Sequence, residues 1–155
     1  MTTRIAMWSG PRNISTAIMR AWENRPDCTV IDEPFYACYL TESKASHPAR
    51  DEIIASQSTN REEVIEQLMS PLNVDVVYQK HMTHHMPEDC DLQFTKALVN
   101  IFLIRYPRSI IASYLDRMPS VNAEAIGIER QSRLFYEIEA VTGRTPWVID
   151  SEDLL

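Results

Sequence analysis

Two short segments of the chain combine cationic side chains with hydroxyl groups, the residue types that hold a phosphate or a sulfate. The first is Ser-Gly-Pro-Arg-Asn-Ile-Ser-Thr over residues 9–16. A turn at Gly10 followed by a helix would leave unpaired N–H groups at the helix N-terminus, where the helix dipole also favours an anion. Arg12 and the two hydroxyls would add donors. The segment therefore predicts an anion-binding loop, although an ordinary capped helix with a surface arginine fits the same residues.

The second segment is Arg-Tyr-Pro-Arg-Ser-Ile-Ile-Ala-Ser over residues 105–113. Arg105 leaves an apolar run, Pro107 is suited to the first turn of a helix, and Ser113 lies about two turns further on. The guanidinium and the serine hydroxyl would then share one phosphate, the arginine with paired donors. The alternative is that Arg105 only ends a strand and that Ser113 packs within the helix.

A cluster of histidines, His81, His84 and His85, follows a third apolar run, and Cys90 is close in sequence. The spacing of His81 and His85 leaves open a metal hydrolase or a phosphotransferase. Metal sites need three or four converging ligands, however, and the adjacent His84 and His85 would point to opposite sides of a strand. We therefore predict no metal site.

Apolar runs alternate with helical patterns along the chain, which would place these segments on a common framework. Strands are predicted at residues 4–8, 29–32, 74–80, 100–105 and 146–150, and helices from Ser15, from Asn60, from Pro107 and over 123–141. This alternation predicts one α/β domain over residues 1–155, with a central, mostly parallel sheet of about five strands. Ligands of such sheets bind at the carboxyl ends of the strands, where both basic segments begin.

Local patterns make these elements more specific. Ser15 is the predicted cap of the first helix, whose inner face would carry Ile14, Ile18, Ala21 and Trp22. Asn60 with a glutamate three residues on is typical of a capping box. Gly143 is placed to end the last helix.

Composition excludes several classes of protein. The 155 residues include 15 Lys plus Arg against 22 Asp plus Glu, a net charge of −7, which argues against nucleic-acid binding. Only three glycines are present, and they are too far apart in the sequence to form a Walker A loop or a dinucleotide-binding fingerprint. Ordinary P-loop ATPases and Rossmann dehydrogenases are therefore excluded. The longest apolar stretch, residues 98–104, is too short to cross a bilayer, and the N-terminus does not read as a signal peptide. With three cysteines and no CxxC spacing, we expect a cytoplasmic protein.

In this order, the two basic segments resemble those of the sulfotransferases that use 3′-phosphoadenosine 5′-phosphosulfate (PAPS). In that family a Pro-Lys/Arg-Ser-Gly-Thr-Thr loop after the first strand grips the 5′-phosphosulfate, and an Arg-x-Pro-Arg/Lys-x5-Ser segment grips the 3′-phosphate. Residues 11–16 and 105–113 match them, and the terminal Val-Ile-Asp-Ser-Glu-Asp-Leu-Leu looks like the family's Glu-Asp-Leu strand end. The resemblance is closest to the branch with arginine in the first loop, which includes tyrosylprotein and carbohydrate sulfotransferases.

The resemblance implies a P-loop-like three-layer fold and a sulfotransferase that moves a sulfuryl group from PAPS to an acceptor hydroxyl, without a metal. It also implies two sets of nucleotide-binding residues. Those of the 5′-phosphosulfate are Gly10, Pro11, Arg12, Asn13, Ile14, Ser15 and Thr16, and those of the 3′-phosphate are Arg105 and Ser113.

The same resemblance assigns catalytic roles. Sulfuryl transfer is an in-line displacement, with a general base on one side of sulfur and positive charge on the other. Glu33, directly after the second predicted strand, would be the base, and Arg12 would stabilise the leaving group; a solvated loop carboxylate is the alternative for Glu33. Cytosolic family members place a catalytic histidine after a lysine at a similar strand end, which makes His81 the alternative base.

The sequence departs from the family pattern in two places. Asn13-Ile14 stands where the family usually has Ser-Gly, and because isoleucine disfavours positive φ we predict either an ordinary backbone at Ile14 or a shift of the loop. Family members usually continue for tens of residues beyond the position of Leu155, and we expect this chain to lack that segment. Both departures keep open a non-catalytic or truncated nucleotide-binding domain on the same fold.

The acceptor is expected to be a small molecule or conjugate that carries a hydroxyl group. Residues 36–60 and the region after His81 would line its site, where Tyr36, Tyr39, Met82 and Met86 predict a partly apolar pocket. No nucleic acid and no membrane is expected as a partner. A short sheet could expose an edge, so a homo-oligomer is possible.

Overall fold

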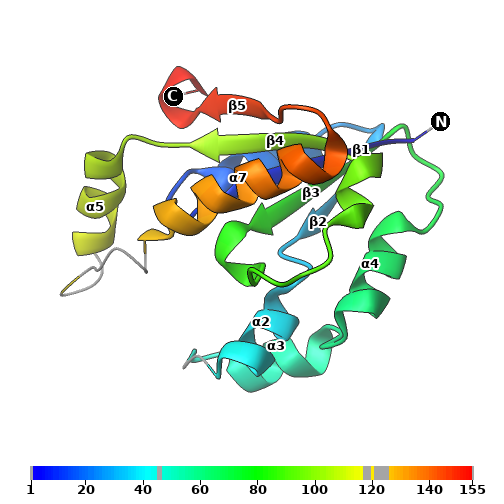
Figure 1. Ribbon diagram of the computed structural model, residues 1–155, viewed down its shortest axis with the longest axis horizontal. Helices are drawn as coiled ribbons and strands as arrows, with labels where there is room; N and C mark the ends of the chain where they lie inside the picture. Colours follow the sequence, from blue (N-terminus) through cyan, green and yellow to red (C-terminus); the bar gives the residue numbers. More distant parts are fainter. Residues whose placement is uncertain (1, 45–46, 117–119, 121–125, 155) are drawn as a thin grey trace.

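The computed structural model describes residues 2–44, 47–116, 120 and 126–154. Its centre is a sheet of five strands in the order β2-β3-β1-β4-β5, and all four strand pairings are parallel (Figure 1). The strands are β1 (Thr3–Ser9), β2 (Cys28–Asp32), β3 (Val76–Met82), β4 (Val99–Ile104) and β5 (Trp147–Asp150). The prediction of an α/β fold with a parallel five-stranded sheet is confirmed.

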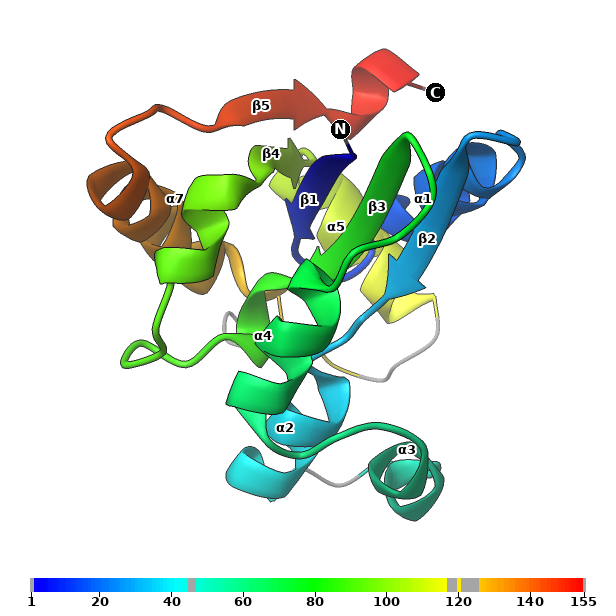
Figure 2. The same cartoon turned by 90° about the vertical axis from the view of Figure 1, so that its right-hand side faces the viewer.

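Helices cover both faces of this sheet, as short apolar strands buried on both sides require. The α-helices are α1 (Ser15–Glu23), α2 (Tyr36–Ser43), α3 (Arg50–Ser56), α4 (Arg61–Met69), α5 (Pro107–Leu115) and α7 (Ile128–Thr142), and the 3₁₀ helices are η1 (Thr83–His85), η2 (Gln93–Ala97) and η3 (Ser151–Leu154). Figure 2 shows α1 and α7 on opposite sides of the sheet. The first residues of the helix predicted over 123–141 lie outside the described residues.

The two cores follow from the alternation of side chains along β1. Ala6 and Trp8 point to the face that α4, α7 and η2 cover, whereas Ile5 and Met7 point to the face of α1. The core on the α1 side also contains Met19 from that helix. β1 is the central strand of the sheet and is buried on both faces. The loop that follows it therefore begins at the middle of the edge formed by the carboxyl ends of the strands.

Helix α1 begins differently from the prediction. Ile14, not Ser15, is its N-cap residue, and no side chain caps it. Ser15 is instead the first helical residue and is buried. Ala21 is exposed, so the inner face of the helix consists of Ile14, Ile18 and Trp22 together with Met19. The missed residue, Met19, is three positions before Trp22, a spacing at which helical side chains share one face.

The other helix boundaries agree with the predictions in most details. The Asn60 side chain accepts hydrogen bonds from the N–H groups of Glu62 and Glu63 at the start of α4. The reciprocal bond of a capping box is replaced, because Glu63 accepts from Ser58 and the Ser58 hydroxyl accepts from the Asn60 N–H. Pro107 opens α5, and Gly143, with φ of 65°, ends α7. No helix in the described ranges is both long and apolar enough to cross a membrane.

Candidate functional site

The loop after β1 has an unusual backbone. Arg12 and Ile14 both have positive φ, 63° and 55°, in the left-handed region that favours glycine. The predicted ordinary backbone at Ile14 is therefore wrong. Between them, the buried Asn13 donates a hydrogen bond from Nδ2 to the carbonyl oxygen of Leu103 in β4, at 3.0 Å. This long-range bond holds the chain in a conformation that the local sequence disfavours.

Gly10 has a packing role in the same loop. A Cβ atom at this position would lie 3.2 Å from the carbonyl oxygen of Ile126 and 3.4 Å from the Gln131 side chain. The close approach of the segment that precedes α7 therefore favours glycine. The loop then delivers the chain to the N-terminus of α1, where the first N–H groups have no acceptor within the helix and no side chain caps them. Of the two predicted hydroxyls there, Ser15 is buried and Thr16 is exposed.

The two basic segments of the sequence come together in space. Arg12 donates from Nε to the Ser113 hydroxyl of α5 at 2.9 Å, and Arg105 donates from Nη1 to the carbonyl oxygen of Arg12 at 2.8 Å. The Nε atom of Arg105 is buried and has no partner among the described residues. Because β1 and β4 are parallel neighbours, their carboxyl ends place the loop and the start of α5 side by side.

Glu33 follows β2 at the same edge of the sheet, with a positive φ of 45°. Its N–H donates to the Lys80 carbonyl oxygen at 2.9 Å, and the Lys80 ammonium donates to Glu33 Oε1 at 2.5 Å and to Asp32 Oδ1 at 2.8 Å. Burial by itself lowers the pKa of Lys80, but its hydrogen bonds to Asp32 and Glu33 outweigh that effect and raise it. The buried lysine thus fixes the Glu33 carboxylate in place.

His81, on neighbouring strand β3, has a different environment. It is 1% exposed, its ring is stacked on Trp8 with centroids 4.3 Å apart, and its Nε2 atom lies 3.1 Å from Gln79 Oε1. Burial lowers the pKa of His81 to about 3, so the imidazole is neutral at neutral pH. The structure therefore places this side chain in the core beside Phe35.

His84 and His85 do not lie on a strand, as the sequence had suggested, but in the 3₁₀ helix η1. Their rings consequently do not point apart and contact each other, with centroids 4.5 Å apart. Burial lowers the pKa of His84 to about 4 and, together with the neighbouring charges of His84 and Lys80 among others, lowers that of His85 to about 2. Within the described part of the chain, no three His, Cys, Asp or Glu side chains are grouped to hold a metal ion.

A cavity of about 710 Å³ opens between the loop after β1 and Glu33. Its lining includes Pro11 and Glu33 together with four residues that were predicted to form a partly apolar pocket, Tyr36, Tyr39, Met82 and Met86. His81 is not part of this lining, whereas His84 and His85 are. The predicted anion-binding loop, through Pro11, and the candidate base Glu33 therefore face one common space.

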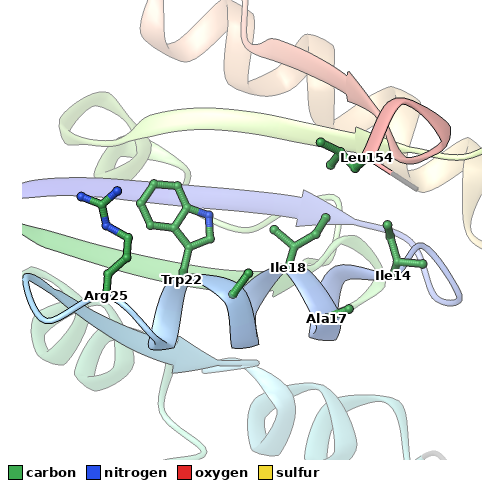
Figure 3. A pocket seen from close by; sticks show the side chains of 7 residues that line it. Ile14, Ala17, Ile18, Trp22, Arg25 and Leu154 are labelled. Atoms are coloured by element: carbon green, nitrogen blue, oxygen red, sulfur yellow. The ribbon is translucent and has the colours of Figure 1, made fainter.

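A separate hollow of about 440 Å³ lies between α1 and η3 (Figure 3). Ile14, Ile18 and Trp22 project into it from one side of the helix, and Leu154 approaches from the other. Its walls are mostly apolar, with Arg25 as the charged member, and Ile14 is the single predicted site residue among those that line it. It has no arrangement of side chains suited to chemistry.

Lys80 is the functional residue to which the sequence analysis assigned no role. A lysine in a buried strand needs a counter-ion, and that requirement is the signal that could have paired it with Asp32-Glu33. Arg130 was also missed. It donates to the carbonyl oxygens of Met86 and Pro87 and pairs with Glu137 at 2.9 Å, and thereby fixes one wall of the cavity.

Comparisons with known proteins agree with this geometry. A family model described as a sulfotransferase domain matches residues 3–154. Two proteins of Arabidopsis thaliana, branched-chain-amino-acid aminotransferase-like proteins 1 and 2, are 28% and 26% identical over 151 residues. The match covers 97% of this chain but only 27% of each relative. The crystal structure of shikimate kinase from Bacteroides thetaiotaomicron is similar in fold, with a TM-score of 0.54 and 10% identity over 97% of this chain and 86% of the kinase.

Proposed function

The chain belongs to the sulfotransferase domain family, and from this premise we propose that it transfers a sulfuryl group from PAPS to an acceptor hydroxyl. The observation that carries the proposal is the contact between its two basic segments. Arg12 and Ser113 are hydrogen-bonded, and Arg105 braces the loop through the Arg12 carbonyl group. The residues proposed for the 5′-phosphosulfate and for the 3′-phosphate are thus held at one edge of the sheet, as a nucleotide with both groups requires.

In this proposal, the 5′-phosphosulfate binds to the N-terminus of α1. Positive φ at Arg12 and Ile14 bends the loop so that successive N–H groups can converge, and such concave backbone arrangements bind anions. The bond to Ser113 uses only the Nε atom of Arg12, and a guanidinium carries four further N–H donors. These donors would stabilise the charge that develops on the departing phosphate.

Glu33 is the proposed general base. It lines the cavity beside Pro11, so an acceptor in that space has a carboxylate on one side and the anion-binding loop on the other. Glu33 would accept the proton of the acceptor hydroxyl while the oxygen attacks sulfur and the bond from sulfur to the bridging oxygen breaks. Lys80 acts through Glu33 as a positioning residue, since its hydrogen bond to Glu33 restricts that carboxylate and its hydrogen bond to Asp32 fixes the ammonium itself.

The first test is a thermal-shift titration with 3′-phosphoadenosine 5′-phosphate, with ADP and 5′-AMP as controls. At 100 times the dissociation constant, binding stabilises a protein by about 2.7 kcal/mol, which is several degrees for a domain of this size. A shift specific to the 3′-phosphorylated nucleotide is expected. A cooperatively folded protein with no shift, or with equal shifts for all three nucleotides, would contradict the proposal.

The Arg105→Ala variant tests the 3′-phosphate site directly. It should weaken binding of 3′-phosphoadenosine 5′-phosphate by about 1.5–3 kcal/mol, the range for hydrogen bonds to charged groups. The loss for 5′-AMP should be clearly smaller, because that nucleotide is affected only through the lost brace on the Arg12 carbonyl group. Arg20→Ala is the matched control, since Arg20 is exposed on α1 and pairs with Glu23. An equal loss of binding for both nucleotides would remove the assignment of Arg105.

A further inference from the structure

The walls of the cavity beside Glu33 restrict the acceptor to one chemical class. We propose that the acceptor is a small phenol without negative charge, whose ring packs against the tyrosines of α2 and whose hydroxyl group meets Glu33. This inference rests on the proposed sulfuryl transfer and adds the identity of the acceptor class. Three independent features of the cavity support it.

The first feature is a stack of three flat rings from α2 and η1. The imidazole of His85 lies between the rings of Tyr36 and Tyr39, at centroid distances of 4.6 and 4.9 Å and interplanar angles of 18° and 24°. Tyr114 of α5 contributes another aromatic side chain to the cavity lining. Because burial keeps His85 neutral at pH 7, the stack is an uncharged surface. Aromatic side chains favour offset or edge-on contact with another ring, so this wall suits a planar aryl group.

The second feature is the balance of charge around the cavity. Its lining contains two carboxylates, Glu33 and Glu88, and one cation, Arg130. That arginine already binds two backbone carbonyl oxygens and the carboxylate of Glu137. Lys80 is likewise committed to two carboxylates. The carboxylates are paired as well, Glu33 with Lys80 and Glu88 with Arg133, so the charges of the lining are balanced. An acceptor with a carboxylate, sulfate or phosphate group would find no unpaired cation among the described residues of the lining, whereas a neutral acceptor needs none.

The third feature is the base itself. Glu33 is a carboxylate held in place by the Lys80 ammonium, and carboxylates as a class are weak proton acceptors. A phenol, with an ordinary pKa of about 10, loses its proton much more readily than an aliphatic alcohol. The phenol proton would pass to Glu33, the phenolate oxygen would form the new O–S bond, and the electron pair of the broken S–O bond would leave with 3′-phosphoadenosine 5′-phosphate.

The cavity volume sets the size of the acceptor. Small-molecule sites usually have volumes of about 300–1,000 Å³, and 710 Å³ lies within this range. Such a space holds a one- or two-ring compound, whereas a long carbohydrate chain would need an open groove.

The experiment uses acceptors of matched size with the full chain and PAPS. 4-Ethylphenol is compared with 4-ethylcyclohexanol, which lacks the aromatic ring, and with 4-hydroxyphenylacetate, which adds a negative charge; methyl glucoside represents sugars. Transfer is measured as kcat/KM, and acceptor binding to the protein saturated with 3′-phosphoadenosine 5′-phosphate is measured by calorimetry. We expect 4-ethylphenol to exceed each of the other acceptors at least tenfold in both measurements.

Two variants at one position test the role of the aromatic wall. Tyr39→Leu should raise KM for 4-ethylphenol about tenfold with the affinity for 3′-phosphoadenosine 5′-phosphate retained, and Tyr39→Phe should restore KM because the ring is restored. Tyr136→Leu is the control, since Tyr136 is exposed on α7 and does not line the cavity.

The outcomes separate this inference from the function on which it rests. Nucleotide binding with faster transfer to, or tighter binding of, the cyclohexanol, the sugar or the anionic phenol overturns the phenol class and keeps sulfuryl transfer. A Tyr39→Leu variant with unchanged KM also overturns the proposed site. If 3′-phosphoadenosine 5′-phosphate does not bind, the proposed function itself fails, whatever the acceptors do.

Discussion

The carboxyl ends of β2 and β3 each carry a candidate base, and the two ends differ in almost every respect. Glu33, after β2, has a left-handed backbone, lines a cavity and is held by a buried ammonium. His81, within β3, is enclosed by Trp8 and Phe35 and is hydrogen-bonded only to a glutamine of its own strand among the described residues. Residue type alone favours histidine as a base at neutral pH, but access to the cavity favours the glutamate.

The comparison shows that two neighbouring positions at the end of one strand can have different roles, because their side chains lie on opposite faces of the sheet. Successive side chains of β3 alternate between faces, so Lys80 reaches Asp32 and Glu33 while its neighbour His81 joins the core of the opposite face. The same strand therefore supplies a positioning residue and a structural residue side by side. Three predictions test this division, and a fourth tests the left-handed backbone that Glu33 shares with Lys44.

The largest expected effect is that of Glu33→Gln on turnover. Loss of a general base usually costs a factor of about 10²–10⁴, and we expect kcat to fall within this range with unchanged affinity for 3′-phosphoadenosine 5′-phosphate. Steady-state kinetics and calorimetry measure the two quantities, and Glu23→Gln on the exposed end of α1 is the control. Wild-type turnover in Glu33→Gln would transfer the role of base to another residue, His81 first.

Replacement of Lys80 should lower the free energy of unfolding and, because Glu33 loses its positioning residue, should also lower turnover. Lys80→Met leaves Asp32 and Glu33 without their shared donor, and we expect the free energy of unfolding at pH 7 to fall by about 1.5–3 kcal/mol. Because the folded pKa of Lys80 is raised, its contribution is complete below the unfolded value of about 10.5 and is lost as the pH rises through the folded value. The difference between wild type and variant in denaturant titrations should therefore shrink in alkali. An equal difference at all pH values would show that packing, not charge, is responsible.

His81→Gln should change stability and its pH dependence but not the chemical step. A substitution of this buried ring is expected to cost about 0.5–3 kcal/mol, with kcat per folded molecule retained. His81 has a folded pKa of about 3 against about 6.5 unfolded, so wild-type stability falls as the pH drops below 6.5, by up to about 1.4 kcal/mol per pH unit from this residue. The variant should take up one proton fewer on unfolding near pH 5. A large loss of kcat would instead identify His81 as part of the catalytic machinery.

The smallest effect concerns backbone conformation. Lys44 ends α2 with φ of 54°, close to the 45° of Glu33, but it is exposed and lines none of the cavities described above. Lys44→Gly should stabilise the protein by about 0.5 kcal/mol, because relief of about 1 kcal/mol of left-handed strain is partly offset by the greater freedom of glycine in the unfolded chain. Thermal unfolding measures this gain. A loss of stability would mean that the left-handed conformation at Lys44 carries no strain to relieve.

The strands and most helices were predictable from local patterns. Apolar, β-branched runs such as Val74 to Lys80 predict buried strands. Asn60 predicts a helix start because its side chain can accept hydrogen bonds from the first N–H groups, and Pro107 does so because its fixed φ suits the first turn. What local patterns could not show is the cap of α1. The positive φ of Ile14 depends on Asn13 reaching Leu103 of β4, a contact between residues 90 positions apart.

The candidate site was predictable in its residues but not in its connections. The family resemblance indicated Arg12, Arg105 and Ser113, and the structure shows that Arg12 joins the other two, by a hydrogen bond to the Ser113 hydroxyl and by one that its carbonyl oxygen accepts from Arg105. The link from Lys80 to Glu33 and the turn that brings His84 against His85 both depend on how β3 ends, which short sequence windows do not determine.

The sheet order has a consequence for the time at which this protein becomes functional. The contacts that assemble the site join residues 101, 93 and 47 positions apart, through Arg12–Ser113, Arg105–Arg12 and Lys80–Glu33. Such distant pairings are entropically costly to close and form slowly. A ribosome must therefore synthesise α5 before the first loop acquires its partners, and Arg12 waits for a serine that is translated 101 positions later.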